Sequence, residues 1–240
     1  MRKILAYLVA LALLATQAAA SNLLIDPYKF AAPASITFLQ CAQDNGNNST
    51  FTFASQNTGT ASADRYTIIA IMGDDSATTF DVTSVTVGGD AATEVADHGA
   101  SGSMNDTALY ILANPAGTSE TVAVTFSEAV VHASICLAQV NGLISATPLD
   151  TAASFDTAAG AITLSVNTTA GGIAVGMCST QTNGVSTIWT GLTERADENL
   201  SEAGAYSYAD LEVVSGATPL SITCDYTGGA DTTGVAASFR

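Results

Sequence analysis

The stretch Leu220–Tyr226, with the sequence LSITCDY, carries the clearest fold signal in the chain, because apolar and polar residues alternate along it. Successive side chains of a β-strand point to opposite faces, so one face of this stretch is apolar and the other is polar. The apolar face holds Leu220, Ile222, Cys224 and Tyr226. This pattern is typical of a strand in an antiparallel sheet that has one buried and one solvated face.

The same kind of run recurs along the chain between groups of turn-forming residues. In Thr121–Phe126, for example, Val122, Val124 and Phe126 alternate with polar or small residues. Glycine-rich groups such as Gly88-Gly89-Asp90 separate the runs and allow the backbone conformations that reverse a chain. Further turns are expected at 73–75, 114–117, 171–172 and 228–229. The expected strands are 35–40, 50–54, 65–72, 84–87, 93–96, 108–112, 121–126, 132–140, 161–166, 172–178, 187–190, 205–208, 211–214, 220–226 and 234–239.

Helical periodicity is weak after residue 30, and only Thr193–Leu200 is expected to form a single helical turn. One open sheet of so many strands would leave a large apolar face uncovered. The sequence therefore predicts an all-β fold, a two-sheet antiparallel β-sandwich of jelly-roll or immunoglobulin-like type, preceded by a short hydrophobic N-terminal helix. The phrases SVTVGGDAATEV and ADLEVVSGATPLSI match too loosely to define a repeat, so residues 34–240 are expected to form a single sandwich domain.

The N-terminus has the layout of an export signal. Arg2 and Lys3 precede an apolar run, and three alanines end at Ala20. A basic start, an apolar core and a small-residue site are what signal peptidase recognises, which predicts cleavage between Ala20 and Ser21. The alternative is a retained hydrophobic helix, in which case residues 1–20 alone would contact a membrane. Residues 21–33 are expected to be an extended segment.

The charge balance excludes one class of partner. Without residues 1–20 the chain has 22 acidic residues and only four basic ones, which gives a formal charge of −18. Binding to nucleic acid requires the opposite sign, because it depends on neutralising phosphates and releasing their counterions. We therefore expect no nucleic-acid partner. Two of the four bases, Arg65 and Arg195, are expected to pair with acidic residues.

Two groups of residues invite a catalytic interpretation, and neither supports it well. Asp97-His98-Gly99-Ala100-Ser101 brings an acid, a base and a hydroxyl together, but catalytic triads are assembled from distant segments beside an oxyanion hole, and a glycine-serine loop explains these residues more simply. His132 begins an expected strand, and an edge or surface position is expected for it. The two histidines have no zinc-ligand spacing. We expect no enzymatic activity and no resident cofactor.

Two weaker binding hypotheses remain. Asp44, Asn45 and Asn47 lie in an oxygen-rich stretch that is a calcium candidate, although the order of residues departs from the known calcium-loop motif and a turn explains the stretch equally well. Trp189 is a candidate ligand contact, because an exposed indole can stack on a sugar. A lone tryptophan in a sandwich is more often part of the core.

The four cysteines, Cys41, Cys136, Cys178 and Cys224, distinguish two cellular settings. They would tend to pair in an exported protein and would stay thiols in a particle assembled in the cytoplasm. Four cysteines allow three pairings, and the sequence selects none of them. Because each lies in or beside an expected strand, buried free thiols are slightly favoured.

Several phrases in a fixed order resemble β-sandwich virion proteins of tailed bacteriophages. The phrases are NLLIDPYKF (22–30), TSVTVGGDAATEVA (83–96), TALYILANPAGTSETVAVTFS (107–127), HASICLAQVNGLISATPLDT (132–151), AGGIAVGMCSTQ (170–181), WTGLTERADENL (189–200) and VSGATPLSITCDYTGGADTTGVAASF (214–239). The resemblance covers about Thr83 to Phe239 and implies a structural or attachment role without enzymatic activity. The export-like leader is where this chain departs from that group.

Two functions follow from these observations. The first is a non-enzymatic structural component of a bacteriophage virion, such as a head decoration, tail or fibre protein, which acts by protein–protein assembly or surface attachment. The alternative is an exported bacterial surface or extracellular-matrix protein that binds glycans or self-assembles. The expected location is the virion, or alternatively the cell surface or medium. The expected partners are other virion or surface proteins and further copies of the chain.

Overall fold

The computed structural model describes residues 32–75, 79–98, 105–113, 117–157, 160–200, 204–215 and 219–240. Within them Pro33–Arg240 belong to one compact unit. The expected N-terminal helix, the cleavage site at Ala20 and Ser21 and most of the segment 21–33 lie outside these residues. Within the described ranges no helix is long and apolar enough to cross a bilayer.

The described residues form 17 strands arranged in four antiparallel sheets, which confirms the predicted all-β class. The N-terminal strands are β1 (Ser35–Asp44), β2 (Asn48–Asn57), β3 (Arg65–Asp74), β4 (Val82–Val87), β5 (Asp90–Ala91), β6 (Thr93–Asp97), β7 (Asn105–Ala113), β8 (Ser119–Val130) and β9 (His132–Asn141). The C-terminal strands are β10 (Asp150–Asp156), β11 (Ala161–Val166), β12 (Gly172–Thr180), β13 (Thr187–Thr190), β14 (Thr193–Leu200), β15 (Gly204–Val213), β16 (Leu220–Tyr226) and β17 (Thr232–Phe239).

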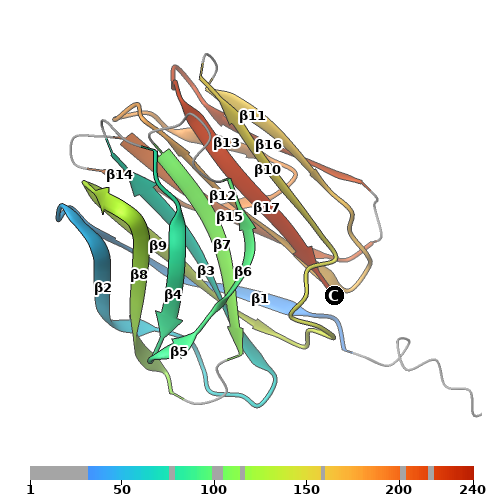
Figure 1. Cartoon of the computed structure of the whole chain (residues 1–240). Helices are drawn as coiled ribbons and strands as arrows, with labels where there is room; N and C mark the ends of the chain where they lie inside the picture. The colour runs from blue at the N-terminus through green and yellow to red at the C-terminus, as the bar shows by residue number, and fades with distance from the viewer. Residues whose placement is uncertain are drawn as a thin grey trace, which may run out of the picture. The chain divides into compact units, whose positions relative to one another are not determined.

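The strand order identifies two jelly rolls in tandem. In the first half β1 pairs with β9, β2 with β8, β3 with β7 and β4 with β5, which is the nested pairing of a jelly roll. In the second half β10 pairs with β17, β11 with β16 and β12 with β15 in the same nested way. We call β1–β9 the N-terminal jelly roll and β10–β17 the C-terminal jelly roll. Figure 1 shows the two groups of strands side by side.

The sheets form four layers instead of the two that were expected. Each jelly roll has a five-stranded sheet, in the orders β1-β9-β3-β7-β6 and β10-β17-β12-β15-β14. A smaller outer sheet covers each of them, in the orders β2-β8-β4-β5 and β11-β16-β13. One apolar cluster contains side chains from both five-stranded sheets, so these two sheets pack against each other at the centre. Packing two sandwiches back to back buries both faces of the five-stranded sheets, which a single two-sheet sandwich does not do.

The central strands explain why alternation was a partial guide to this fold. β12 is buried at every position and β3 at nearly every one, since each is covered on both faces. Such strands read as continuous apolar runs. Alternation does hold in the outer sheets, where Val122, Val124 and Phe126 of β8 are buried and their neighbours are not, as predicted. The predicted faces of β16 are confirmed in the same way.

The two jelly rolls share a short sequence repeat that sequence analysis missed. β6 contains Thr93–Asp97, with the sequence TEVAD, and β14 contains 193–197, with the sequence TERAD. Both strands have a β-bulge at the same place, where Val95 and Arg195 are skipped in the pairing with β7 and β15. A search for this pentapeptide would have revealed the duplication, whereas the two phrases compared above come from strands that are not equivalent.

Several local expectations were wrong. Thr193–Leu200 is the edge strand β14 and not a helical turn, because its bulge breaks the strict alternation by which strands are recognised. The expected turn at Gly73 is the end of β3. Glycine is required there for packing, since a Cβ atom would lie 2.6 Å from the ring of Phe80 and 2.7 Å from that of Phe126. The strands β5 and β10 were not predicted, and the two strands expected at 205–208 and 211–214 are the single strand β15.

Candidate functional site

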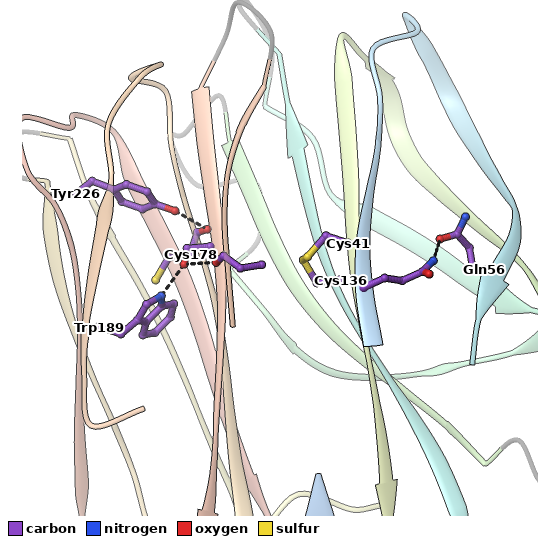
Figure 2. Close-up of a disulfide and its surroundings, with 9 residues drawn as sticks. Cys41, Gln56, Cys136, Cys178, Trp189 and Tyr226 are labelled. Atoms are coloured by element: carbon purple, nitrogen blue, oxygen red, sulfur yellow. Dashed lines mark hydrogen bonds between the residues drawn. A yellow bond between two sulfur atoms is a disulfide. The ribbon is translucent and has the colours of Figure 1, made fainter. Parts of the chain in front are cut away.

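The cysteines divide into one disulfide and two thiols. Cys41 of β1 and Cys136 of β9 are paired neighbours in the sheet and form a disulfide (Figure 2). The slight preference for four free thiols was therefore wrong for this pair and right for Cys178 and Cys224, which are free and buried. Burial raises the pKa of both thiols, and each thiol is the other's hydrogen-bonding neighbour. Neither has the low pKa of a nucleophilic cysteine.

Trp189 packs inside the C-terminal jelly roll. Its indole Nε1 donates a hydrogen bond to Ser207 Oγ at 2.7 Å, and Ser207 Oγ donates to the carbonyl of Ala196 at 2.7 Å (Figure 2). The ring lies over Gly176, where an added Cβ would be 3.0 Å from it. The indole is partly buried and joins the apolar clusters between the two sheets. This packing favours a core role over the sugar-stacking role considered above.

The oxygen-rich stretch at Asp44, Asn45 and Asn47 forms the turn between β1 and β2. The Oδ1 atom of Asp44 accepts the backbone N–H of Gly46 at 2.8 Å, which is the hydrogen bond of an Asx turn. Asp44 is exposed at the end of its strand. Turn formation, which was the simpler interpretation, therefore accounts for Asp44, and calcium binding by this stretch stays a prediction.

His132 lies in the interior, and the expected edge or surface position was wrong. It is 8% exposed at the start of β9, which lies between β1 and β3 in its sheet. Its Nδ1 atom is 3.5 Å from Oδ2 of Asp74, the residue that it faces across the strand pair. Burial, and then the charge of Asp75, raises the pKa of Asp74 to about 7.

Of the segment Asp97–Ser101, which invited comparison with a catalytic triad, the structure describes only Asp97 and His98. Asp97 ends β6, and the His98 ring packs against Phe155 of β10 with centroids 5.4 Å apart. Gly99, Ala100 and Ser101 lie outside the described residues. His98 is thus part of the contact between the two jelly rolls.

Arg195 and Arg65, which were both expected to pair with acidic residues, have different hydrogen-bond partners. Arg195 donates from Nε to Oδ1 of buried Asp210 at 2.8 Å, and its Nη2 lies 2.8 Å from the same oxygen, so this pair is confirmed. The guanidinium of Arg65 is almost completely buried and donates to the carbonyls of Gly59 at 3.2 Å and Gly117 at 2.7 Å. Arg65 therefore ties two loops together at one end of the N-terminal jelly roll.

A group of three carboxylates is the strongest candidate site in the described residues, and sequence analysis did not find it. Asp81 precedes β4, Asp97 ends β6 and Asp106 is the second residue of β7. One carboxylate oxygen from each lies within 4.8 Å of the other two. The three residues are spread over 26 positions and share no motif spacing, so only the pairing of β6 with β7 and the approach of the β4 entry bring them together.

Burial makes this group electrostatically costly. Asp106 is 1% exposed, and burial and then the charge of Asp97 raise its pKa well above the usual range. Tyr110 lies beside the group and donates its hydroxyl to the carbonyl of Val82 at 3.0 Å, with Glu94 Oε2 also at 3.3 Å. We refer to Asp81, Asp97 and Asp106 as the carboxylate triad.

Comparison with known proteins does not identify a family. No family model matches the chain, and no curated protein matches its sequence. Among solved structures, an anti-sigma factor domain-containing protein is 11% identical with a TM-score of 0.24, and the match covers 78% of each chain. The PBSX exported protein XepA is 12% identical with a TM-score of 0.22, over 85% of this chain and 86% of that one. A structure of infectious bursal disease virus, Gx strain, gives 12% identity and a TM-score of 0.28, over 87% and 42%. These scores are too low to support a functional argument.

Proposed function

We propose that the chain is a non-enzymatic structural protein of a bacteriophage virion, where it serves as a head decoration, tail or fibre component and acts by assembly or attachment. The observation that carries the proposal is the tandem of jelly rolls joined through a buried apolar face. Jelly rolls are common in viral capsid proteins, although a fold alone does not assign a function. The phrases that resemble phage virion proteins map onto β4–β17 of this tandem.

The outer sheets offer surfaces suited to such a role. The solvent side of β2 and β8 carries small hydroxylated residues, and Thr50 Oγ1 lies 3.3 Å from Thr125 Oγ1 across the pair. In the C-terminal jelly roll Thr163 of β11 pairs with Thr223 of β16 in the same manner. Among the described residues, the edge strands β2 and β11 of the two outer sheets each pair on one side alone, and such an edge can accept a strand from a neighbouring subunit.

An exported bacterial surface or matrix protein is the second candidate, and the disulfide favours it. Disulfides persist in oxidising compartments and are rare in the cytoplasm, where phage particles assemble. Cys41–Cys136 is closed in the structure. Together with the export-like leader, this bond supports delivery outside the cell.

One measurement separates the two candidates. Mass spectrometry of the native protein, purified in parallel from virions and from culture medium, reports both the N-terminal peptide and the thiol state. Recovery from virions at a fixed ratio to the major capsid protein is expected for a virion component. Absence from particles, together with a mature N-terminus at Ser21 and an oxidised Cys41–Cys136 pair in the medium, would reject the virion proposal in favour of export.

A further inference from the structure

The carboxylate triad has the size of a calcium site. Its three oxygens come from three different segments of the N-terminal jelly roll and lie within 4.8 Å of one another. Calcium binds oxygen ligands at about 2.3–2.6 Å, so ligands on opposite sides of the ion are about 5 Å apart. Magnesium requires about 2.1 Å and near-ideal octahedral geometry, which makes it a poorer match for three side chains on separate strands. One calcium ion can therefore contact all three residues.

A second observation points to a ligand at this place. Asp106 is 1% exposed and its Oδ2 atom accepts the backbone N–H of Val82 at 3.2 Å, but its Oδ1 atom is buried without a hydrogen-bond donor among the described residues, and only a protonated carboxyl can share a hydrogen bond with Asp97. An unsatisfied buried carboxylate oxygen is strongly unfavourable. The charge that faces Asp106 is that of Asp97, another carboxylate. Two facing carboxylates attract each other only through a shared proton or a cation.

The C-terminal jelly roll provides an internal comparison. Asp197 ends its TERAD segment as Asp97 ends TEVAD, and each follows the same bulge. Asp197 accepts the backbone N–H of Thr187 at 3.1 Å and its hydroxyl at 3.0 Å, so both oxygens are satisfied within the protein. Thr187 begins β13 opposite Tyr226, just as Val82 begins β4 opposite Phe126. Val82, the counterpart of Thr187, has no hydroxyl to donate. The carboxylates of Asp81 and Asp106 lie near Asp97 instead.

We propose that Asp81, Asp97 and Asp106 bind one calcium ion, which holds the entry of β4 against the β6–β7 pair in the N-terminal jelly roll. Water completes the six to eight oxygen ligands that calcium takes. The ion takes the place that the Thr187 side chain fills in the C-terminal jelly roll. The site is separate from the stretch at Asp44, and it does not depend on which of the two proposed functions is correct.

The test uses the full chain with calcium chloride alone as the probe, after treatment with a chelator. Calorimetric titration and thermal unfolding are measured on the wild type and on D97N, D106N and the control D90N, which removes the same charge from an exposed position on β5. We expect one site with a dissociation constant on the order of 0.1–1 mM, as in extracellular calcium modules. Calcium should raise the melting temperature of the wild type and of D90N, and D97N and D106N should lose this response.

The proposal is rejected if the wild type binds no calcium, if D97N keeps the full response, or if magnesium gives the same stabilisation as calcium. A shared proton between Asp97 and Asp106 would appear as stabilisation on acidification with no calcium response, and this too rejects it. Should D106N fail to fold because its amide N–H groups are buried without acceptors, D97N decides the question, since Asp97 is only half-buried.

Discussion

The two jelly rolls have the same strand order but differ in which sheets supply the large side chains of their interiors. In the N-terminal jelly roll both sheets supply them, with Ile69, Tyr110 and Leu137 from the five-stranded sheet and Phe51, Phe53 and Phe126 from the outer sheet. In the C-terminal jelly roll the corresponding side of that sheet carries small residues, and Trp189 from the outer sheet covers them. The shared bulge shows that large Tyr110 and small Ala209 occupy corresponding positions of the two five-stranded sheets. Tyr110 pairs with Glu94 just before the bulge of β6, and Ala209 pairs with Glu194 just before the bulge of β14.

This difference shows that the strand order determines the space between the two sheets of a jelly roll but does not determine which sheet supplies the large side chains that fill it. A protein core must be packed to high density, and a large residue on one side requires a small one opposite. The pair Trp189 and Gly176 meets this requirement in the C-terminal jelly roll. Duplicated sandwiches can therefore diverge in sequence until only a bulged strand, TEVAD or TERAD, still shows their relation.

The two halves also differ in how they are held together. A disulfide spans most of the N-terminal jelly roll, since Cys41 and Cys136 are 95 positions apart in the sequence. The C-terminal jelly roll has two thiols, and its buried acid Asp210 is paired with Arg195 at 2.8 Å. The N-terminal jelly roll carries buried acids at Asp74, 3.5 Å from His132, and at Asp106, beside two further carboxylates. Breaking each of these features in turn tests the comparison.

Removing the disulfide should have the largest effect. The double variant C41A/C136A is expected to lower the free energy of unfolding by about 4 kcal/mol, as the loop-entropy model gives for a loop of this length. The measurement is denaturant unfolding under non-reducing conditions. Reductant should lower the stability of the wild type toward that of the double variant and leave the variant unchanged.

The matched control for this prediction is C224A, which alters a buried thiol of the other jelly roll. Its stability should not respond to reductant beyond the change seen in the wild type. Equal stability of the wild type and C41A/C136A without reductant would mean that the covalent link adds nothing to the packing of β1 against β9.

Sequence analysis predicted most strands and missed how they are grouped. Alternation is visible in β8 and β16 because each has one solvated face, and it disappears in β3 and β12 because both of their faces are buried. A continuous apolar run indicates that both faces of a strand are buried, but it does not indicate which sheets cover those faces. The duplication was nonetheless detectable from TEVAD and TERAD at Thr93–Asp97 and 193–197.

The carboxylate triad could not have been predicted in the same way. Its members come from the entry of one strand, the end of a second and the start of a third, and each looks like an ordinary acidic residue near a turn. Their convergence depends on the jelly-roll pairing, which local patterns do not determine. The cysteine pairing depends in the same way on the register that sets Cys41 opposite Cys136.

Truncating Trp189 should have the next largest effect, and it tests the idea that the outer sheet fills the C-terminal jelly roll. W189A is expected to cost about 3 kcal/mol, the low end for a tryptophan in a core, because the ring is only partly buried. V85A changes the corresponding position of the N-terminal jelly roll, where both sheets supply large side chains, and it should cost clearly less. Unfolding of both variants in denaturant gives the comparison, and similar losses would contradict it.

The smallest of the three effects concerns the buried acid Asp74, which has no charged counterpart near the end of β12, where Ser179 and Thr233 share a hydrogen bond at 2.9 Å. The pKa of Asp74 is raised to about 7 in the folded chain, from an unfolded value of about 3.9. The folded state therefore binds the proton more tightly, so this stabilisation is complete below the unfolded pKa and is lost as the pH rises through 7. Between pH 4 and pH 8 the wild type should lose stability on the order of 2 kcal/mol relative to D74N, less than the full shift implies because His132 lies close by.

Denaturant unfolding at each pH measures this difference, with D225N on the outer sheet of the C-terminal jelly roll as the control. Parallel pH profiles for the wild type and D74N would show that Asp74 stays ionised in the folded protein, and the N-terminal jelly roll would then hold a buried carboxylate without the arginine partner that Asp210 has in the C-terminal one.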